Sequence, residues 1–140
     1  MRKLILIADD DAMHRQLLTD ALQAVGHDTL TAEDGMRAIE LARSVKPSLI
    51  LMDVQMPVRD GISALKAMKT DPATLDIPII AVSALAMDGD RDRMLQAGFD
   101  GYLGKPVSIK ELRTEVNRHL EKSETQNGLR NETEDFDSGR

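Results

Sequence analysis

The sequence predicts an α/β fold, a three-layer doubly wound (βα)5 domain with helices on both faces of a five-stranded parallel sheet. First, short apolar runs alternate along the chain with longer segments of helical periodicity. Second, the runs LILIA, LILM and IIAV are apolar at successive positions, as strands buried on both faces are. Third, 140 residues correspond to one domain of ordinary size and can bury an aliphatic core without disulfides.

Each predicted strand coincides with one apolar run. The intervening segments can each hold a helix of about 10–14 residues, which is the arrangement of βαβ units and of a parallel sheet. The five runs cover Leu4–Ala8, Thr29–Thr31, Leu49–Met52, Pro78–Val82 and Tyr102–Leu103.

The first helix is predicted after Asp11, which we interpret as its N-cap, and it ends at Gly26, the residue type that commonly terminates helices. Its apolar residues recur at helical spacing, so we expect them to form one stripe toward the core. The stripe consists of Met13, Leu17, Leu18, Ala21, Leu22 and Val25.

Four more helices follow from the same periodicity. We expect the second helix to end before Pro47. The third is expected to begin at about Gly61 and to end at Asp71, which a proline follows. The fourth covers roughly Asp88–Ala97. The fifth, Ser108–Glu121, begins with a serine cap.

Composition excludes several classes of function. Eighteen basic against 24 acidic residues give a net charge of −6, which disfavours non-specific nucleic-acid binding. The absence of cysteine excludes disulfides, cysteine-ligated zinc and a thiol nucleophile. Because no apolar run approaches the roughly 20 residues of a membrane span, we expect a cytoplasmic protein with no membrane partner.

The C-terminal segment differs from the rest of the chain. Residues 123–140 hold five acids and two bases and show no periodicity, so we expect a polar, acidic and disordered tail after a domain over residues 1–122. Because this tail is too short for an output domain, the sequence predicts a single-domain protein without a DNA-binding domain.

Polar side chains follow the predicted strands at their carboxyl ends. Asp9 and Asp10 follow the first strand, Asp53 the third, Ser83 the fourth and Lys105 the fifth. In open α/β sheets ligands bind beyond the carboxyl ends of the strands, so these groups are expected to meet at one edge.

Such clustered carboxylates repel one another. At about 4–5 Å and an effective dielectric of about 20, each pair costs about 3–4 kcal/mol, so either a proton or a cation is needed among them. Oxygen ligands without histidine or cysteine favour Mg²⁺, with Mn²⁺ as an alternative. A metal ion, a lysine and a hydroxyl together are typical of phosphoryl transfer.

A structural role such as helix capping does not account for all of these acids. Two consecutive acids, Asp9 and Asp10, exceed what one helix cap needs. No helix begins beside Asp53, because Met56 and the proline after it prevent one. We therefore expect these acids to be functional. The histidines show no ligand spacing, and we expect surface positions for His14, His27 and His119.

Five motifs together resemble the receiver domain of two-component response regulators, over residues 1 to about 122. The resemblance implies a flavodoxin-like sheet with strand order 2-1-3-4-5. The sequence is similar to stand-alone receiver domains and to the receiver domains of hybrid histidine kinases. The motifs are ILIADDD at 5–11, EDG at 33–35, LILMDVQMPVRDG at 49–61, IPIIAVSA at 77–84 and GYLGKP at 101–106.

The resemblance implies a role for each site residue. Asp53 matches the phosphoacceptor, which takes a phosphoryl group from a phosphohistidine in a Mg²⁺-dependent reaction. Asp10 and Asp53 match metal ligands, Asp9 matches an acid that acts partly through metal-bound water, and Gln55 supplies a backbone carbonyl to the metal.

The resemblance also implies a switch. Lys105 matches the lysine that contacts the phosphoryl group, and its bond to Pro106 resembles the cis peptide of the family. Ser83 and Tyr102 match the two switch residues. The implied protein is a signalling phosphoacceptor and not an enzyme, although it promotes its own phosphotransfer and autodephosphorylation. Its implied partner is a sensor histidine kinase or a His-containing phosphotransfer protein, and the sequence does not identify a downstream target.

Three other functions stay open at this point. A receiver can act as a binding module without being phosphorylated. A Mg²⁺-dependent aspartyl phosphatase would want a second acid where Gln55 stands, two residues after the nucleophile. A flavin or nucleotide binder would need a phosphate-binding loop after the first strand, where the aspartates at 9–11 repel phosphate.

Overall fold

The computed structural model describes residues 2–56, 60–84 and 89–121, and the predicted tail at 123–140 lies outside these residues. Strands and helices alternate along the described chain. The strands are β1 (Leu4–Ala8), β2 (Asp28–Ala32), β3 (Leu49–Asp53), β4 (Ile79–Ser83) and β5 (Gly101–Gly104). The helices are α1 (Ala12–Gln23), α2 (Gly35–Val45), α3 (Gly61–Lys69), α4 (Asp90–Ala97) and a C-terminal helix over residues 109–121.

The five strands form one parallel sheet in the order β2-β1-β3-β4-β5. This confirms the predicted fold class and the flavodoxin-like strand order. The register pairs Ala8 of β1 with Met52 of β3, and Asp53 of β3 with Val82 of β4. The strands therefore end nearly level with one another, and the residues that follow them meet at one edge.

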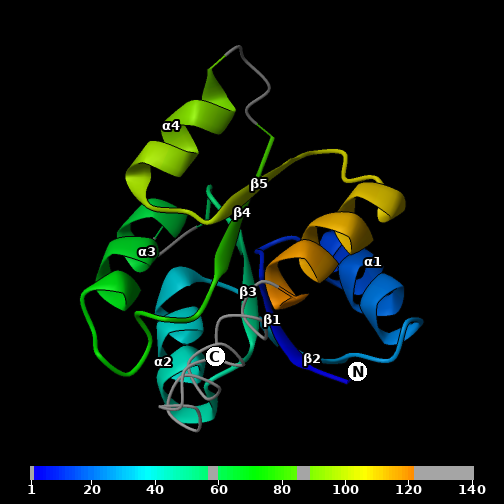
Figure 1. The fold of residues 1–140 in the computed structure, drawn as a ribbon, viewed down its shortest axis with the longest axis horizontal. Coiled ribbons are helices and arrows are strands. Elements are labelled where there is room, and N and C mark those ends of the chain that lie inside the picture. The colour runs from blue at the N-terminus through cyan, green and yellow to red at the C-terminus, as the bar shows by residue number, and fades with distance from the viewer. Residues whose placement is uncertain (1, 57–59, 85–88, 122–140) are drawn as a thin grey trace, which may run out of the picture.

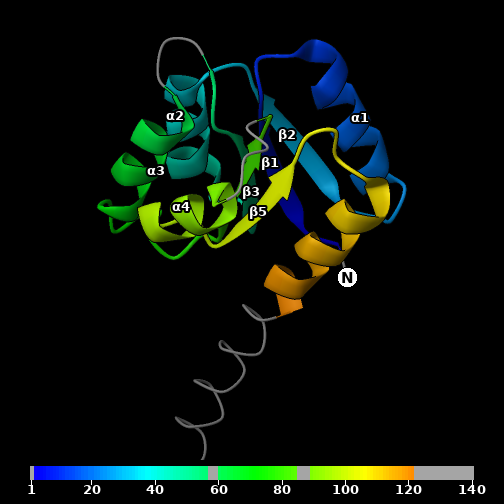
Figure 2. The same cartoon turned by 90° about the horizontal axis from the view of Figure 1, so that it is seen from above.

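Helices cover both faces of the sheet. Figures 1 and 2 show α2, α3 and α4 on one side of the strands and α1 with the C-terminal helix on the other. Two apolar clusters correspond to these two sides, one between the sheet and α2, α3 and α4, the other beneath α1 and the C-terminal helix. The molecule thus has the three predicted layers.

Strand β1 shows why the apolar runs do not alternate with polar residues. Leu6 packs into the first cluster, whereas Ile5 and Ile7 pack into the second. Successive side chains of a strand point to opposite faces, so a strand covered on both faces needs an apolar residue at every position. Each fully buried aliphatic side chain contributes about 1.5–3 kcal/mol to folding.

Side-chain caps fix where several helices begin. Asp11 accepts hydrogen bonds from the backbone N–H groups of Met13 and His14 at the start of α1. Ser108 accepts one from the N–H of Glu111 at the start of the C-terminal helix. Both caps confirm sequence predictions, and each such cap is worth about 1 kcal/mol.

The predicted stripe of α1 is only half buried. Leu18, Ala21 and Leu22 are buried, but Met13 is 83% exposed, and Leu17 and Val25 are exposed as well. At about 100° per residue, Leu17 and Met13 lie progressively farther around the helix from Leu18, beyond the sector that the sheet covers. Val25 lies past the end of the helix, where Gly26 turns the chain with a φ of +93°. The prediction of one buried stripe was therefore wrong for these three residues.

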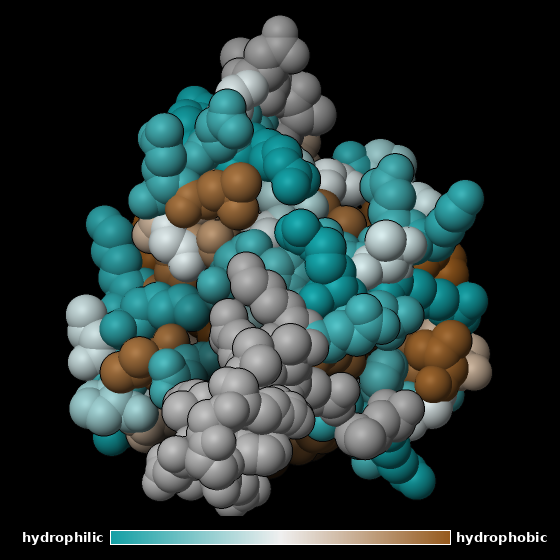
Figure 3. All heavy atoms as spheres, in the orientation of Figure 1, coloured by the Kyte–Doolittle hydropathy of each residue, from teal (hydrophilic) through white to brown (hydrophobic). Residues whose placement is uncertain are grey.

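The predicted start of the fourth helix at Asp88 lies outside the described residues, in which α4 begins at Asp90. Among the residues described, no helix is both long and apolar enough to cross a membrane. Figure 3 shows a mostly hydrophilic face with hydrophobic surface in separate patches.

Candidate functional site

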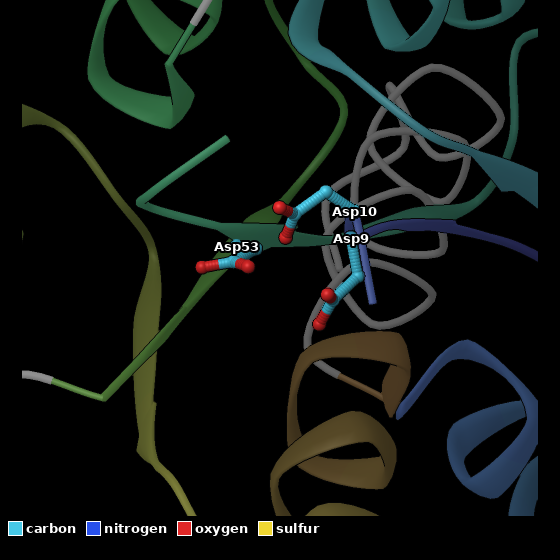
Figure 4. Close-up of side chains that lie close together, drawn as sticks. All are labelled: Asp9, Asp10 and Asp53. Atoms are coloured by element: carbon cyan, nitrogen blue, oxygen red, sulfur yellow. The ribbon is translucent and has the colours of Figure 1, made fainter. Parts of the chain in front are cut away.

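Three aspartates meet at the carboxyl edge of the sheet. Asp9 and Asp10 follow β1, and Asp53 is the last residue of β3, the neighbouring strand. One carboxylate oxygen from each lies within 4.8 Å of those of the other two, and Figure 4 shows the three carboxylates gathered at this edge. Asp9 and Asp53 are buried, while Asp10 is exposed.

The backbone around the cluster is held from two sides. The guanidinium of Arg15 donates to the backbone carbonyl of Asp9 at 2.8 Å and ties α1 to the end of β1. On the other side, a Cβ at Gly61 would lie 2.5 Å from the carbonyl oxygen of Asp53. Only glycine permits this approach, which brings the start of α3 against the end of β3.

Lys105 adds the one cation seen between these acids among the described residues. Its Nζ lies 3.2 Å from Oδ2 of Asp53 and 3.3 Å from Oδ2 of Asp9. The backbone N–H of Lys105 donates to the carbonyl of Ser83 at 2.8 Å, which fixes the chain just after β5. The peptide bond from Lys105 to Pro106 is cis.

The remaining predicted site residues lie around this cluster. Ser83, the last residue of β4, is buried beside Gly104 in the sheet register. The backbone N–H of Gln55 donates to Oδ1 of Asp53 at 3.0 Å. Tyr102 is half-buried, and a Cβ at Gly104 would lie 3.8 Å from its hydroxyl, so its ring extends along β5 toward the site.

Sequence reasoning missed one residue of the site, His14. Its Nδ1 lies 2.5 Å from Oδ2 of Asp9, and its side chain is 12% exposed. The other two histidines, His27 and His119, are buried, so the prediction of surface positions was wrong. One feature of the sequence could have indicated this contact: His14 lies in the first turn of the helix that begins just after Asp9, and this turn lies close to the end of β1.

The pKa values of the two buried aspartates shift in opposite directions. Burial and the negative charge of Asp9 raise the pKa of Asp53 above its usual value, despite the hydrogen bond from Gln55 and the charge of Lys105. Burial alone would also raise the pKa of Asp9, but hydrogen bonds from His14 and from the N–H of Asp11, together with Lys105, outweigh burial and lower it. The site therefore favours an ionised Asp9 beside an Asp53 that retains its proton more readily.

The pKa of Lys105 is raised, because the charges of Asp9 and Asp53 outweigh the effect of its burial. Within the described part of the chain, one ammonium faces three carboxylates, so these groups carry an excess of negative charge when all are ionised. A set of carboxylate oxygens within 4.8 Å and without a thiol fits a hard divalent cation such as Mg²⁺ or Mn²⁺. The arrangement can therefore hold such a cation beside a nucleophilic carboxylate.

Known proteins resemble this chain in sequence and in fold. Residues 5–117 match the family described as the response regulator receiver domain. The chain is 37% identical over 120 residues to the polar-differentiation response regulator DivK of Brucella anthropi, covering 86% of this chain and 98% of the relative. The chain belongs to the response regulator receiver domain family.

Solved structures agree with this assignment. The receiver domain of a Francisella response regulator superposes with a TM-score of 0.81 at 35% identity, covering 86% of this chain and 98% of that one. The receiver domain of a Pseudomonas aeruginosa sensor histidine kinase superposes with a TM-score of 0.79 at 32% identity, over 86% and 98% of the two chains. That structure has a magnesium ion coordinated in its active site cleft. Receiver domains are signalling phosphoacceptors that bind Mg²⁺ at an acidic site.

Proposed function

We propose that Asp53 accepts a phosphoryl group from a phosphohistidine of a sensor histidine kinase or a His-containing phosphotransfer protein. The observation that supports this most strongly is the placement of Lys105, whose Nζ lies 3.2 Å from Asp53 and 3.3 Å from Asp9. A buried carboxylate with an ammonium at its side has both a nucleophile and a group that stabilises the charge of a phosphoryl oxygen.

In the transfer, a carboxylate oxygen of Asp53 attacks phosphorus. An oxygen–phosphorus bond forms and the nitrogen–phosphorus bond of the donor breaks. Its electron pair returns to the imidazole nitrogen, which takes up a proton, and the product on the protein is an acyl phosphate. Lys105 remains beside the new phosphoryl group and holds one of its oxygens. Attack of water on the acyl phosphate at the same site releases inorganic phosphate and returns the Asp53 carboxylate, which is the autodephosphorylation of a signalling phosphoacceptor.

The residues proposed to hold Mg²⁺, or Mn²⁺ in its place, are Asp10, Asp53 and the backbone carbonyl of Gln55, with Asp9 acting partly through a bound water. When bound, the cation neutralises negative charge on the carboxylates and on the incoming phosphoryl oxygens. Burial and the charge of Asp9 raise the pKa of Asp53, and a bound cation would oppose this shift and favour the ionised carboxylate. This ionised form is the nucleophile.

We propose that the acyl phosphate is read by Ser83 and Tyr102. Phosphorylation adds about −1.5 to −2 charges and new acceptor oxygens beside Lys105 and Ser83. The hydroxyl of Ser83 turns to donate to one of these oxygens and draws the end of β4 inward. Tyr102 then rotates into the vacated space, and the surface of α4, β5 and the C-terminal helix changes shape for a protein target.

The test of the phosphoacceptor uses acetyl phosphate as the donor. We expect the protein with Mg²⁺ to gain the mass of one phosphoryl group in intact mass spectrometry. Asp53→Asn, which keeps the shape of the side chain, is expected to show no gain. An unmodified wild-type protein, or an undiminished gain in the variant, would overturn the proposal.

A further inference from the structure

His14 contacts the acidic cluster but plays no part in the reaction described above. It lies in the first turn of α1, and its Nδ1 is 2.5 Å from Oδ2 of Asp9. The side chains are 12% and 1% exposed, so water competes little for this contact. A hydrogen bond sheltered in this way constrains the carboxylate far more than one on the surface.

The chemistry of the pair assigns the tautomer of the ring. An ionised carboxylate offers only lone pairs, so Nδ1 of His14 must carry the hydrogen and donate it to Asp9. Nε2 of His14 is buried and has no hydrogen-bond partner among the residues that the structure describes. The polar contact that the ring makes within the described chain is therefore directed at Asp9.

Asp9 is held at both of its oxygens. Oδ1 accepts from the backbone N–H of Asp11 at 2.9 Å, and Oδ2 faces both His14 and Lys105. Lys105 is shared with Asp53 and sits farther from Asp9 than His14 does, at 3.3 Å against 2.5 Å. Without His14, this shared lysine would be the one remaining partner of Oδ2 among the residues that the structure describes.

We propose that His14 is a positioning residue of the cation site: its Nδ1–H fixes the Asp9 carboxylate in the orientation that lets it bind a divalent cation with Asp10 and Asp53. This rests on the proposed function, since it concerns the same site. Partners that orient metal ligands in this way contribute about 10- to 100-fold to metal affinity. His14 thus sets how much Mg²⁺ or Mn²⁺ the protein needs, without touching the phosphoryl group.

Two polar variants separate the hydrogen bond from the bulk of the ring. In His14→Asn the amide nitrogen superposes on Nδ1 and can still donate to Asp9. In His14→Gln the amide reaches the position of Nε2 instead and offers no donor at Nδ1. Both are tolerated in the first turn of a helix, and circular dichroism establishes that each variant is folded.

The measurement is the affinity for Mn²⁺ alone, followed by the electron paramagnetic resonance signal of the free ion at one fixed pH. We expect His14→Asn to bind within about threefold of wild type and His14→Gln to bind about tenfold or more weakly. With acetyl phosphate, His14→Gln should need correspondingly more Mg²⁺ for half-maximal phosphorylation, while its rate at saturating Mg²⁺ stays that of wild type.

Three outcomes would overturn the inference. Wild-type affinity in His14→Gln would show that the contact does not position Asp9. Equal weakening in both variants would assign the effect to the ring and not to Nδ1–H. Nitrogen NMR of the wild-type protein showing the hydrogen of neutral His14 on Nε2 would remove the donor, whatever the variants do. In all three the proposed function stands, whereas a wild-type protein that neither binds Mn²⁺ nor takes up phosphoryl groups would overturn both.

Discussion

Each edge of the sheet brings a basic side chain together with carboxylates, but the two edges differ in their balance of charge and in burial. At the amino edge, the guanidinium of Arg2 donates two hydrogen bonds, of 2.8 and 2.6 Å, to the carboxylate of Asp28, and both side chains are exposed. The hydrogen bond from Arg2 lowers the pKa of Asp28. At the carboxyl edge, a single lysine, Lys105, faces two buried carboxylates, and the pKa of one of them, Asp53, is raised.

The difference lies in balance and burial. A matched, exposed ion pair is screened by water and contributes little to stability. A buried excess of negative charge lowers stability, and such conflicts persist in natural proteins mainly where function needs them. The unbalanced charge of the carboxyl edge therefore favours the binding of a cation. The amino edge, where the charges are matched, has no such preference.

The largest expected effect on the carboxyl edge is the loss of phosphorylation rate when Lys105 is replaced. Lys105→Ala removes the ammonium beside Asp53 and should slow phosphorylation by acetyl phosphate by about a hundredfold to a thousandfold, as the loss of a preorganised charge-stabilising group does. The rate is followed by intact mass. Arg2→Ala is the matched control at the other edge, and a comparable slowing there would contradict a local role for Lys105.

Next in size is the response of the switch. Because Tyr102 is the only tyrosine and tryptophan is absent, tyrosine emission reports on this residue alone. We expect phosphorylation to change the emission, and Ser83→Ala to lose most of that change while still gaining phosphoryl mass. Ser44→Ala, on α2, serves as the control. A Ser83→Ala protein that still switched fully would contradict the proposed coupling.

Mg²⁺ should stabilise the protein only through the carboxyl edge. At a concentration about 100 times its dissociation constant, a ligand of the folded state adds about 2.7 kcal/mol to the free energy of unfolding. We expect most of this gain to vanish in Asp10→Asn and to persist in Asp28→Asn, as measured by thermal denaturation with and without chelator. Equal gains in both variants would place the binding elsewhere.

The smallest effect concerns stability without metal. Asp53→Asn should raise the free energy of unfolding by about 1 kcal/mol at pH 7, because it removes a buried carboxylate that repels Asp9. Asp28→Asn should lower the stability only slightly, because the exposed pair with Arg2 that it breaks contributes little. Urea denaturation of the two variants at equal ionic strength measures both effects.

The dependence on pH follows from the direction of each pKa shift. An acid whose pKa is raised on folding contributes its full stability below its unfolded value of about 3.9, and loses it as pH rises through the raised pKa. The gain from Asp53→Asn should therefore shrink toward pH 4 and grow as pH rises through the raised pKa of Asp53. The pKa of Asp28 is lowered, so its contribution is present at pH 7 and lost as pH falls. Parallel behaviour of the two variants would contradict the contrast between the edges.

The sequence was sufficient to predict which residues share the carboxyl edge. Runs apolar at every position identify parallel strands, and the strand-end rule then brings Asp9, Asp53 and Lys105 together without any distance being known. The helix caps at Asp11 and Ser108 were equally local, because a cap depends on the next three residues.

Other features needed the packed structure. The helical period of α1 groups Met13 and Leu17 with Leu18, but how wide a sector the sheet covers depends on how the helix is seated. The contact of His14 with Asp9 depends on the direction in which the first turn of α1 leaves the strand. Burial of His27 and His119 depends on neighbours far away in the sequence, which periodicity does not report.

The most direct test of the central claim locates the phosphoryl group. The protein is phosphorylated in the presence of Mg²⁺ and treated with borohydride, which reduces an acyl phosphate on aspartate to homoserine, and peptides are then mapped by mass spectrometry. We expect homoserine at position 53 and aspartate unchanged at positions 9, 10 and 28. Homoserine at any of those other positions, with Asp53 unmodified, would contradict the assignment of Asp53 as the phosphoacceptor.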